Sequence, residues 1–388
     1  GGSFETEQYG ATVSGRTGRF AGTLSVASFE TDGISQSAIQ PERDAYENTT
    51  VHFRGQADLT DWLTVTAVAR QVDAEVETDT QDFAFPTTPT QGLVIDSDNQ
   101  TDSRLRYGRV QIDAAALDGA WTHALRYTRS ESDTDFEAGG LFNSGFRGER
   151  DRYEYETSYA FGTGSVEHHL TGAIQREDLE FDSVAADPVD SFSREDDQTS
   201  YVAEYAVRSD RASLSASVRH DSNDRFDDAT TWRVTGSWQF VDTGTRVHAS
   251  AGTGITNPGF FELFGFIPSS FTGNPDLEPE HSTGFDVGVE QSFLDGRALI
   301  DVTWFDADLT DEIAIEFDFA SLTTSPVNLS GESDRQGVEV LLRAALTDTF
   351  SMSGSYTYVD SSDPTGRREV RRPRHTGSLN LNLDLGRT

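Results

Sequence analysis

The sequence lacks cysteine and lysine altogether, has one methionine, and carries its positive charge on 30 arginines. Without cysteine, disulfide frameworks, thiolate zinc sites and cysteine nucleophiles are excluded. No apolar run reaches the roughly 18 residues that a membrane helix needs, which excludes a helical membrane protein. The 66 acidic residues leave a net charge of −36, which repels phosphate backbones and excludes a nucleic-acid partner.

Apolar and polar residues alternate strictly in many segments. Between Thr231 and Phe240, one face holds Trp232, Val234 and Trp238, and polar residues fill the intervening positions. This period of two is typical of a β-strand with one apolar and one polar face. Aromatic residues make up 11% of the chain, which argues against disorder despite the charge. The sequence therefore predicts an all-β protein.

Tight turn signals and long polar stretches follow one another in turn. A soluble β-sandwich shows the same apolar and polar alternation, but compact soluble domains rarely contain structureless loops beyond about 12–15 residues. Outer-membrane barrels combine short turns at one end with long loops at the other. Tight turns are expected at 17–18, 60–61, 118–119, 162–164, 209–210, 242–244, 295–296 and 347–348. Long loops are expected at 31–45, 77–102, 131–149, 182–197, 221–229, 254–278, 309–332 and 360–370.

This arrangement predicts seventeen strands, sixteen flanking the eight turns and one over 371–385. A sheet in lipid has to close into a barrel, because an open edge leaves unpaired backbone amides that cost several kcal/mol each. An odd count does not suit a closed antiparallel barrel. The expected fold is therefore a transmembrane antiparallel β-barrel, with residues 1–388 forming one barrel domain that is incomplete at both ends.

The stretches Thr256–Gly265 and Gly273–Ser282 begin a series of short sequence markers that continues to His375. Gly273–Ser282 resembles the strand-entry motif of the TonB-dependent outer-membrane receptors, and Thr256–Gly265 resembles the segment before it. Asn328 and Gly337–Glu339 stand where similar receptors carry an Asn and a Gly-Val-Glu, and Pro373–His375 matches a Pro-x-His. The positions that carry the resemblance are Asn274, Pro275, Leu277, Pro279, Glu280, Ser282, Gly337, Glu339, Pro373 and His375.

The resemblance implies a barrel of about 22 strands around an N-terminal plug, in the outer membrane of a Gram-negative bacterium. About one strand is then expected before Gly1 and about four after Thr388, and the plug is absent from the sequence. Members of the family work with the TonB-ExbB-ExbD energy-coupling complex, which acts on the plug. Outer-membrane lipid is the expected surroundings of the barrel.

Within the family, Arg219–Phe226 followed by Thr231 and Trp232 is most similar to the cobalamin-transporter branch. The resemblance implies active import of a large, scarce nutrient, with cobalamin first. Catecholate-siderophore receptors are similar in several of these segments, so a ferric siderophore is the alternative ligand. A passive porin is a more remote alternative, because it would have fewer strands and none of these markers.

The strand-entry motif has a structural interpretation and a ligand-binding one. Pro275 and Pro279 fix φ near −65° and lack an N–H, so they can direct the chain from a loop into a strand without any ligand. This structural role is favoured over direct ligand contact.

Aromatic side chains in three long polar stretches are the candidate ligand contacts. They could stack on a flat macrocycle or a catecholate, since apolar loop surface usually means a partner or a packed hinge. Packing against the plug or against neighbouring loops is the competing interpretation. The candidates are Phe83, Phe85, Phe142, Phe146, Phe260, Phe261, Phe264 and Phe266.

Clustered carboxylates suggest calcium, which takes six to eight oxygen ligands. Four acids share a predicted strand face, and three more are expected to close the loop after it. The resemblance adds to this hypothesis because some cobalamin receptors order their loops with calcium. Ordinary solvated acids are the alternative in so acidic a chain. The candidate ligands are Asp73, Glu75, Glu77, Asp79, Asp96, Asp98 and Asp102.

No catalytic motif is present. The chain has no Gly-x-Ser-x-Gly elbow, Walker loop or His-Glu-x-x-His. His168 and His169 are adjacent on a predicted strand and would point to opposite faces, so they form a poor metal site. The sequence therefore predicts a protein that is not an enzyme and that requires no cofactor, apart from the calcium considered above.

Overall fold

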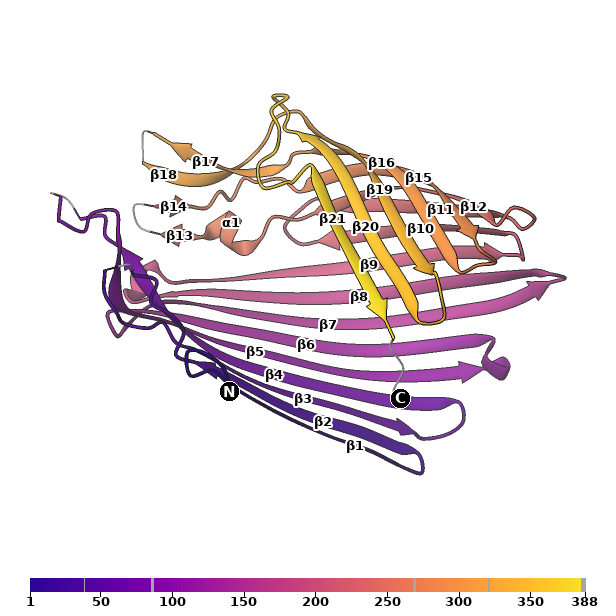
Figure 1. Ribbon diagram of the computed structural model, residues 1–388, viewed down its shortest axis with the longest axis horizontal. Helices are drawn as coiled ribbons and strands as arrows, with labels where there is room; N and C mark the ends of the chain where they lie inside the picture. The colour runs from indigo at the N-terminus through magenta and orange to yellow at the C-terminus, as the bar shows by residue number, and fades with distance from the viewer. Residues whose placement is uncertain (38, 85–86, 268–269, 320–321, 385–388) are drawn as a thin grey trace. The chain divides into compact units, whose positions relative to one another are not determined.

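The chain folds almost entirely into β-structure. The computed structural model describes residues 1–388 apart from 38, 85–86, 268–269, 320–321 and 385–388. Phe85 and Leu385 therefore lie outside the described residues. Seventeen long antiparallel strands belong to one sheet, as the turn pattern predicts (Figure 1). Among the described residues, none of the helices has the length and apolar character needed to cross a membrane.

The chain divides into two compact units, each described here by itself. The first unit comprises Gly1–Thr157, Ala173–Thr199 and Asn223–Arg225. The second comprises Ser158–Gly172, Ser200–Ser222 and Phe226–Thr388. Strands β7 (Leu141–Thr163), β8 (Val166–Ala185), β9 (Phe192–Arg208) and β10 (Ala212–Asn223) contribute residues to both units.

The first unit is built from consecutive antiparallel neighbours, each strand pairing with the next from β1 to β6. A short 3-10 helix, η1 (Leu117–Gly119), makes the turn between its last two strands, and η2 (Pro188–Asp190) lies between β8 and β9. The strands are β1 (Glu7–Thr17), β2 (Phe20–Thr31), β3 (Tyr46–Asp58), β4 (Leu63–Gln81), β5 (Val94–Ala116) and β6 (Trp121–Ala138).

The second unit repeats this up-and-down order. Antiparallel ladders join β10 to β11, β11 to β12, β12 to β15, β15 to β16, β16 to β19, β19 to β20 and β20 to β21. The additional strands are β11 (Ala229–Phe240), β12 (Thr245–Thr256), β15 (Glu280–Phe293), β16 (Ala298–Thr310), β19 (Glu332–Ala345), β20 (Phe350–Ser362) and β21 (His375–Leu383).

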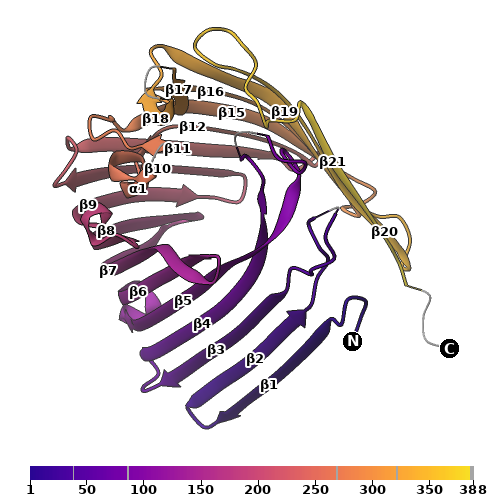
Figure 2. The same cartoon turned by 90° about the vertical axis from the view of Figure 1, so that its left-hand side faces the viewer.

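A small second sheet lies at one end of the strands of the second unit, beside the only α-helix among the described residues (Figures 1 and 2). Its strand order is β13-β14-β18-β17, and it belongs to the two longest connections of the unit. The elements are α1 (Phe260–Phe264), β13 (Phe266–Ile267), β14 (Phe271–Thr272), β17 (Ile313–Asp318) and β18 (Thr323–Asn328).

Large apolar side chains are exposed on one face of the strands. Trp232 and Val234 expose 43% and 40% of their surface, and Trp238 and Phe240 each expose 50%. A soluble sandwich would bury these four residues in its core. Their exposure removes the sandwich alternative and fits a face that contacts lipid, as in a membrane barrel.

All eight tight turns lie where the sequence predicts them, but several long loops were predicted wrongly. The expected loop at 131–149 is a turn at Gly139 and Gly140, because β6 and β7 continue to either side of it. The expected loop at 77–102 shrinks to 82–93 for the same reason. With 23 residues, β5 is about 75 Å long, more than twice a bilayer core of about 30 Å. Beyond the apolar band both faces are polar, so the alternation that marks a strand disappears although the ladder continues.

Candidate functional site

Two asparagines hold the segment that leaves the 257–279 connection. Asn274 donates a hydrogen bond from Nδ2 to the carbonyl of Pro326 in β18 at 3.1 Å. Asn328 accepts from the N–H of Glu278 at 2.9 Å and donates to its carbonyl at 2.9 Å. Leu277, between them, is 3% exposed. The strand-entry segment is therefore docked on β18 by side chains that replace a strand ladder.

The remaining residues of this motif surround the start of β15. Pro275 is exposed and Pro279 is half-buried. Glu280 accepts a hydrogen bond from the N–H of Ile313 at 2.7 Å, which ties β15 to the start of β17. Ser282 lies opposite Gly254 in the ladder with β12. These contacts join neighbouring connections. They fit the structural role of the strand-entry motif, in which its residues direct the chain into β15 without a ligand.

The two downstream markers occupy different environments. At Gly337 an added Cβ would clash with the carbonyl oxygen of Tyr358 and lie 2.6 Å from the ring of Phe305, so only glycine fits. Glu339 and Pro373 are exposed. His375 is hydrogen-bonded through Nδ1 to the Tyr356 hydroxyl at 2.8 Å.

The aromatic candidates around α1 are of two kinds. Phe261 stacks on Phe271 with ring centroids 4.8 Å apart and planes at 15°, and Phe271 is 8% exposed. Phe260 and Phe264 are half-buried. Phe266, at the start of β13, exposes 48% of its surface. Phe261 thus packs inside the connection, whereas Phe266 is available to a ligand.

The aromatic candidates in the first unit are also divided. Phe142 and Phe146, expected in a loop, belong to strand β7. Phe146 lies 5.8 Å from the ring of Phe136 and 5.8 Å from that of Phe181, so it packs between strands. Phe142 is 40% exposed, and Phe83, in the 82–93 connection, is 74% exposed. Phe85 lies outside the described residues.

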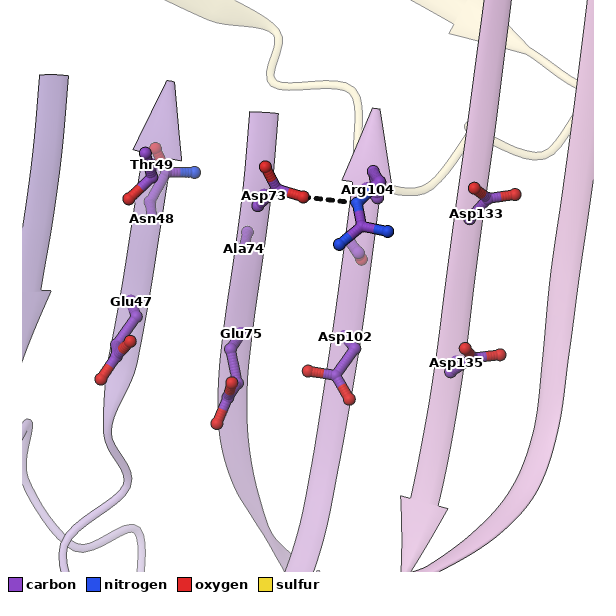
Figure 3. A pocket seen from close by; sticks show the side chains of 11 residues that line it. Glu47, Asn48, Thr49, Asp73, Ala74, Glu75, Asp102, Arg104, Asp133 and Asp135 are labelled. Carbon is purple, nitrogen blue, oxygen red and sulfur yellow. Dashed lines mark hydrogen bonds and ion pairs between the residues drawn. The ribbon is translucent and has the colours of Figure 1, made fainter. Parts of the chain in front are cut away.

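Four carboxylates form one straight row across the strands of the first unit (Figure 3). Glu47 of β3 pairs with Glu75 of β4, Glu75 pairs with Asp102 of β5, and Asp102 pairs with Asp135 of β6. A recess of about 330 Å³ lies along this row. Like charges directly opposite each other destabilise a sheet, so this row carries an electrostatic cost.

The other predicted calcium ligands do not join this row. Asp73 forms an ion pair with Arg104 at 2.6 Å (Figure 3). Glu77 accepts a hydrogen bond from the N–H of Ala45 at 3.0 Å. Asp98 is exposed. The expectation that Asp96, Asp98 and Asp102 close a loop is wrong, because all three belong to β5, whose ladder continues past the apolar band.

A second acidic group joins Asp79 and Asp96 to Glu42, from the 32–45 connection. The oxygens of the three carboxylates lie within 4.8 Å of one another. Asp79 Oδ2 and Asp96 Oδ1 are buried and have no hydrogen-bond partner among the described residues. Desolvation and the negative charge of Asp96, followed by Asp98, Asp79 and Glu77, raise the pKa of Glu42. Buried carboxylate oxygens without a donor fit a hard cation.

An arginine in the second unit joins two long connections. Arg335 of β19 forms ion pairs with Glu312 and, at 2.6 Å, with Glu369 in the 363–374 connection. Arg372 pairs with Glu369 at 2.6 Å. Ser333 is fully buried and donates to Glu312 at 2.5 Å. Burial opposes ionisation of Glu369, but the hydrogen bonds and charges of Arg335, with Arg372, lower its pKa.

Sequence reasoning missed Glu42, Glu47, Asp135 and the Arg335 network. The predicted turn at 60–61 fixes the pairing of Glu47 with Glu75, and the turn at 118–119 fixes that of Asp102 with Asp135. These two pairs could therefore have been predicted from the sequence. Glu42 comes from a connection without any local pattern, and only the tertiary structure brings it to Asp79.

The chain matches a known protein family over nearly its whole length. The family model described as TonB dependent receptor-like, beta-barrel matches residues 13–387. The chain is 29% identical over 171 residues to the vitamin B12 transporter BtuB of Photobacterium profundum, which is 42% of this chain and 26% of that protein. It is 29% identical over 168 residues to an iron-regulated outer membrane virulence protein of Vibrio cholerae, 38% of this chain and 26% of that protein. The matched segments thus cover about a quarter of each relative.

Solved structures share the fold. The siderophore receptor PirA from Acinetobacter baumannii has a TM-score of 0.79 at 15% identity, over 99% of this chain and 64% of that one. PirA from Pseudomonas aeruginosa has a TM-score of 0.78 at 14% identity, over 98% of this chain and 66% of that one. At such identity the likeness concerns the fold alone.

Proposed function

The chain belongs to the TonB-dependent receptor family, and from this premise we propose that it takes part in the active import of a large, scarce nutrient across the outer membrane of a Gram-negative bacterium. Cobalamin is the first candidate ligand. The observation that carries this choice is the similarity, over 171 residues, to a protein named as a vitamin B12 transporter.

The placement of aromatic and apolar surface supports ligand capture at the loop end of the strands. Phe266 and Ile267, in the small sheet of the second unit, are 48% and 46% exposed. Their backbone pairs with β14, and Leu263 and Leu277 of the same connection are buried. Exposed rings on an ordered base offer a stacking surface to a flat macrocycle.

Energy coupling is part of the same proposal. Import against a gradient needs a source of work that a barrel wall does not contain. The TonB-ExbB-ExbD complex of the inner membrane, acting through a plug, is the partner that family membership supports. An enzymatic role is not proposed, because the matched family and the similar proteins are named as receptors and transporters.

A ferric siderophore is the second candidate. The observation that favours it is the 29% identity to an iron-regulated outer membrane virulence protein. Exposed aromatic rings such as Phe83 and Phe266 suit a catecholate as well as a macrocycle, so the surface alone does not separate the two ligands.

We further propose that calcium orders the connections of the first unit at Glu42, Asp79 and Asp96. Its support is the pair of buried carboxylate oxygens without a donor, on Asp79 and Asp96. A bound divalent cation would neutralise the three carboxylates and join the 32–45 connection to β4 and β5. The row that contains Glu75 and Asp102 is a second acidic position. Arg104 lines its recess (Figure 3), and Asp135 at the end of the row pairs with Arg147 at 2.6 Å.

Equilibrium binding tests the ligand. Cobalamin and a ferric catecholate siderophore are titrated against the protein in outer-membrane vesicles, and vesicles from a strain without the gene serve as the control. Saturable cobalamin binding supports the first candidate. Binding of the iron complex alone moves the function to siderophore uptake, and binding of neither rejects both ligands.

The calcium proposal has its own test and a matched control. Asp96→Asn removes one carboxylate of the group, and Asp98→Asn removes an exposed carboxylate two residues away. Calcium should raise the thermal unfolding midpoint of the unchanged protein and of Asp98→Asn but not of Asp96→Asn, since a ligand that binds only the folded state stabilises it. An equal calcium response in all three proteins contradicts the proposal.

A further inference from the structure

Arginines gather on one face of the first unit, although the chain as a whole is strongly acidic. In β3 the residues His52, Arg54 and Gln56 alternate with Val51 and Phe53, so the arginine lies on the polar face. The same alternation places arginines on the polar face of the following strands. They are Arg54, Arg70, Arg109, Arg126, Arg150 and Arg152.

A recess of about 420 Å³ opens on this face along β5, β6 and β7. It is large enough for a small organic anion, and its charged lining consists of four arginines and one glutamate. The charged residues are Arg109, Arg126, Arg150, Arg152 and Glu154.

Some of these arginines are already neutralised. Arg126 is paired with Glu154 and with Glu156, the latter at 3.0 Å. Arg150 is paired with Glu177 at 2.6 Å, and Arg152 contacts the same two glutamates, Glu154 and Glu177, at 3.2 and 3.4 Å. These ion pairs form a fixed rim on one side of the recess.

Three other arginines have no carboxylate partner among the described residues: Arg54, Arg70 and Arg109. Arg109 donates one hydrogen bond, from Nη2 to the amide oxygen of Gln111. Their positions follow from the register. Val68 pairs with Arg54 on one side and with Arg109 on the other, and Arg70 is two residues further along the same strand. Both Arg54 and Arg109 are therefore diagonal neighbours of Arg70, at a Cα separation of about 7–8 Å.

The two nearest carboxylates of this face, Asp58 and Asp113, form no ion pair with these three side chains in the part of the chain that the structure describes. Asp58 pairs with Arg16 at 2.8 Å, and Asp113 accepts from Gln111 at 2.6 Å. Three like charges at such spacing repel one another, and a planar guanidinium is well suited to a carboxylate or phosphate oxygen pair. An oxyanion among them removes the repulsion and satisfies their donors.

We propose that Arg54, Arg70 and Arg109, with the adjoining recess, bind an oxyanion-bearing solute, either a carboxylate or a phosphate. The inference rests on the proposed function for its location, since in a barrel of this family the polar face lines the lumen. This anion site narrows the class of imported solute to molecules with peripheral carboxylate or phosphate groups, which would contact the polar face of the first unit.

Citrate and inorganic phosphate are the probes. Each is titrated calorimetrically against the detergent-purified protein at low ionic strength, where charged contacts are least screened. Arg109→Gln and Arg70→Gln remove members of the group. Arg106→Gln is the matched control, because it lies on the same strand as Arg109 but on the opposite face, near Glu131.

Citrate should bind the unchanged protein and Arg106→Gln with the same dissociation constant, which should rise about tenfold in Arg109→Gln and in Arg70→Gln. Phosphate should follow the same order if the site recognises oxyanions in general, and only citrate should do so if it requires a carboxylate. Citrate binding that is absent, or equal in all four proteins, overturns the proposal.

A carboxylate supplied by the protein itself would give a different result. Arg109→Gln would then lower the thermal unfolding midpoint, and citrate would not bind, which also overturns the proposal. Import of cobalamin or iron complexes is measured separately, so a failed import assay with intact citrate binding counts against the proposed function and leaves the anion site standing.

Discussion

Asn328 pairs with the backbone of Glu278 as a neighbouring strand would. Its Oδ1 accepts from the Glu278 N–H and its Nδ2 donates to the Glu278 carbonyl, both at 2.9 Å. The same Nδ2 also donates to the carbonyl of Asp311 at 2.7 Å. One side chain thus joins the 257–279 connection to both ends of the connection between β16 and β19, which explains why an asparagine at this position serves the fold.

Asn328→Ala should release the strand-entry segment. The Glu278 amide and carbonyl lose their partners, and each unsatisfied group costs about 1–3 kcal/mol where water cannot replace the bond. Amide exchange of residues 274–280 should accelerate, as measured by hydrogen–deuterium exchange with mass spectrometry. Asn380→Ala, on exposed β21, is the control. Unchanged exchange at 274–280 would show that Asn274 alone holds the segment.

Gly337→Ala should impair folding. The added Cβ would clash with the Tyr358 carbonyl oxygen on a paired strand, and the backbone cannot move without breaking the β19–β20 ladder. The expected cost is about 3 kcal/mol or more. Heat-dependent electrophoretic mobility reports the folded fraction. Gly148→Ala, where a Cβ meets nothing within 4 Å, should fold normally. Equal folded fractions in the two variants would refute the steric explanation.

Acid should loosen the 363–374 connection before the strands. The pKa of Glu369 is lowered, so its ion pairs with Arg335 and Arg372 stabilise the fold above the ordinary glutamate pKa of about 4.3 and are lost as the pH falls through the lowered value. Glu369→Gln should reduce the difference in urea midpoint between about pH 7 and about pH 3. Glu316→Gln, an exposed glutamate of β17, should keep that difference. An unaltered pH profile in Glu369→Gln would contradict this role.

Two phenylalanines of the α1 connection should respond differently to truncation. Phe266→Ala removes an exposed ring and should weaken ligand binding, by about tenfold for a stacking contact near 1.4 kcal/mol, with the unfolding midpoint unchanged. Phe261→Ala removes the stack on Phe271 and should lower the unfolding midpoint instead. Cobalamin titration and thermal unfolding are measured on both variants. A loss of stability without a loss of binding in Phe266→Ala would assign that ring to packing.

The strands and tight turns could be predicted from the sequence because two local signals coincide. Within the apolar band, residues such as Trp232, Val234 and Trp238 contrast sharply with their polar neighbours. Turn residues with positive φ, such as Gly18 and Gly164, then separate the strands. Both signals depend only on nearby residues, which is why seventeen strands and eight turns were predicted correctly.

The loops and the acidic groups needed information that local patterns do not contain. Glu75 meets Asp102 through the β4–β5 ladder, whose register depends on a long connection and shifts between Thr78 and Thr80. Asp79 lies four residues beyond Glu75 on β4, and the shift places it beside Asp96 of β5. The sequence indicated Glu75, Asp79, Asp96 and Asp102 as acidic candidates, but their partners follow from this register and, for Glu42, from the tertiary structure.

The continuous pairing of β5 and β6 reaches as far as Gln100 and Glu137, close to the turn at Gly139 and Gly140. Since this backbone is already fixed before any partner arrives, an incoming molecule does not have to order it. Pre-organisation of this kind lowers the entropy lost on association. A molecule bound at this end of the first unit should therefore dissociate more slowly than one that makes equal contacts with a flexible loop.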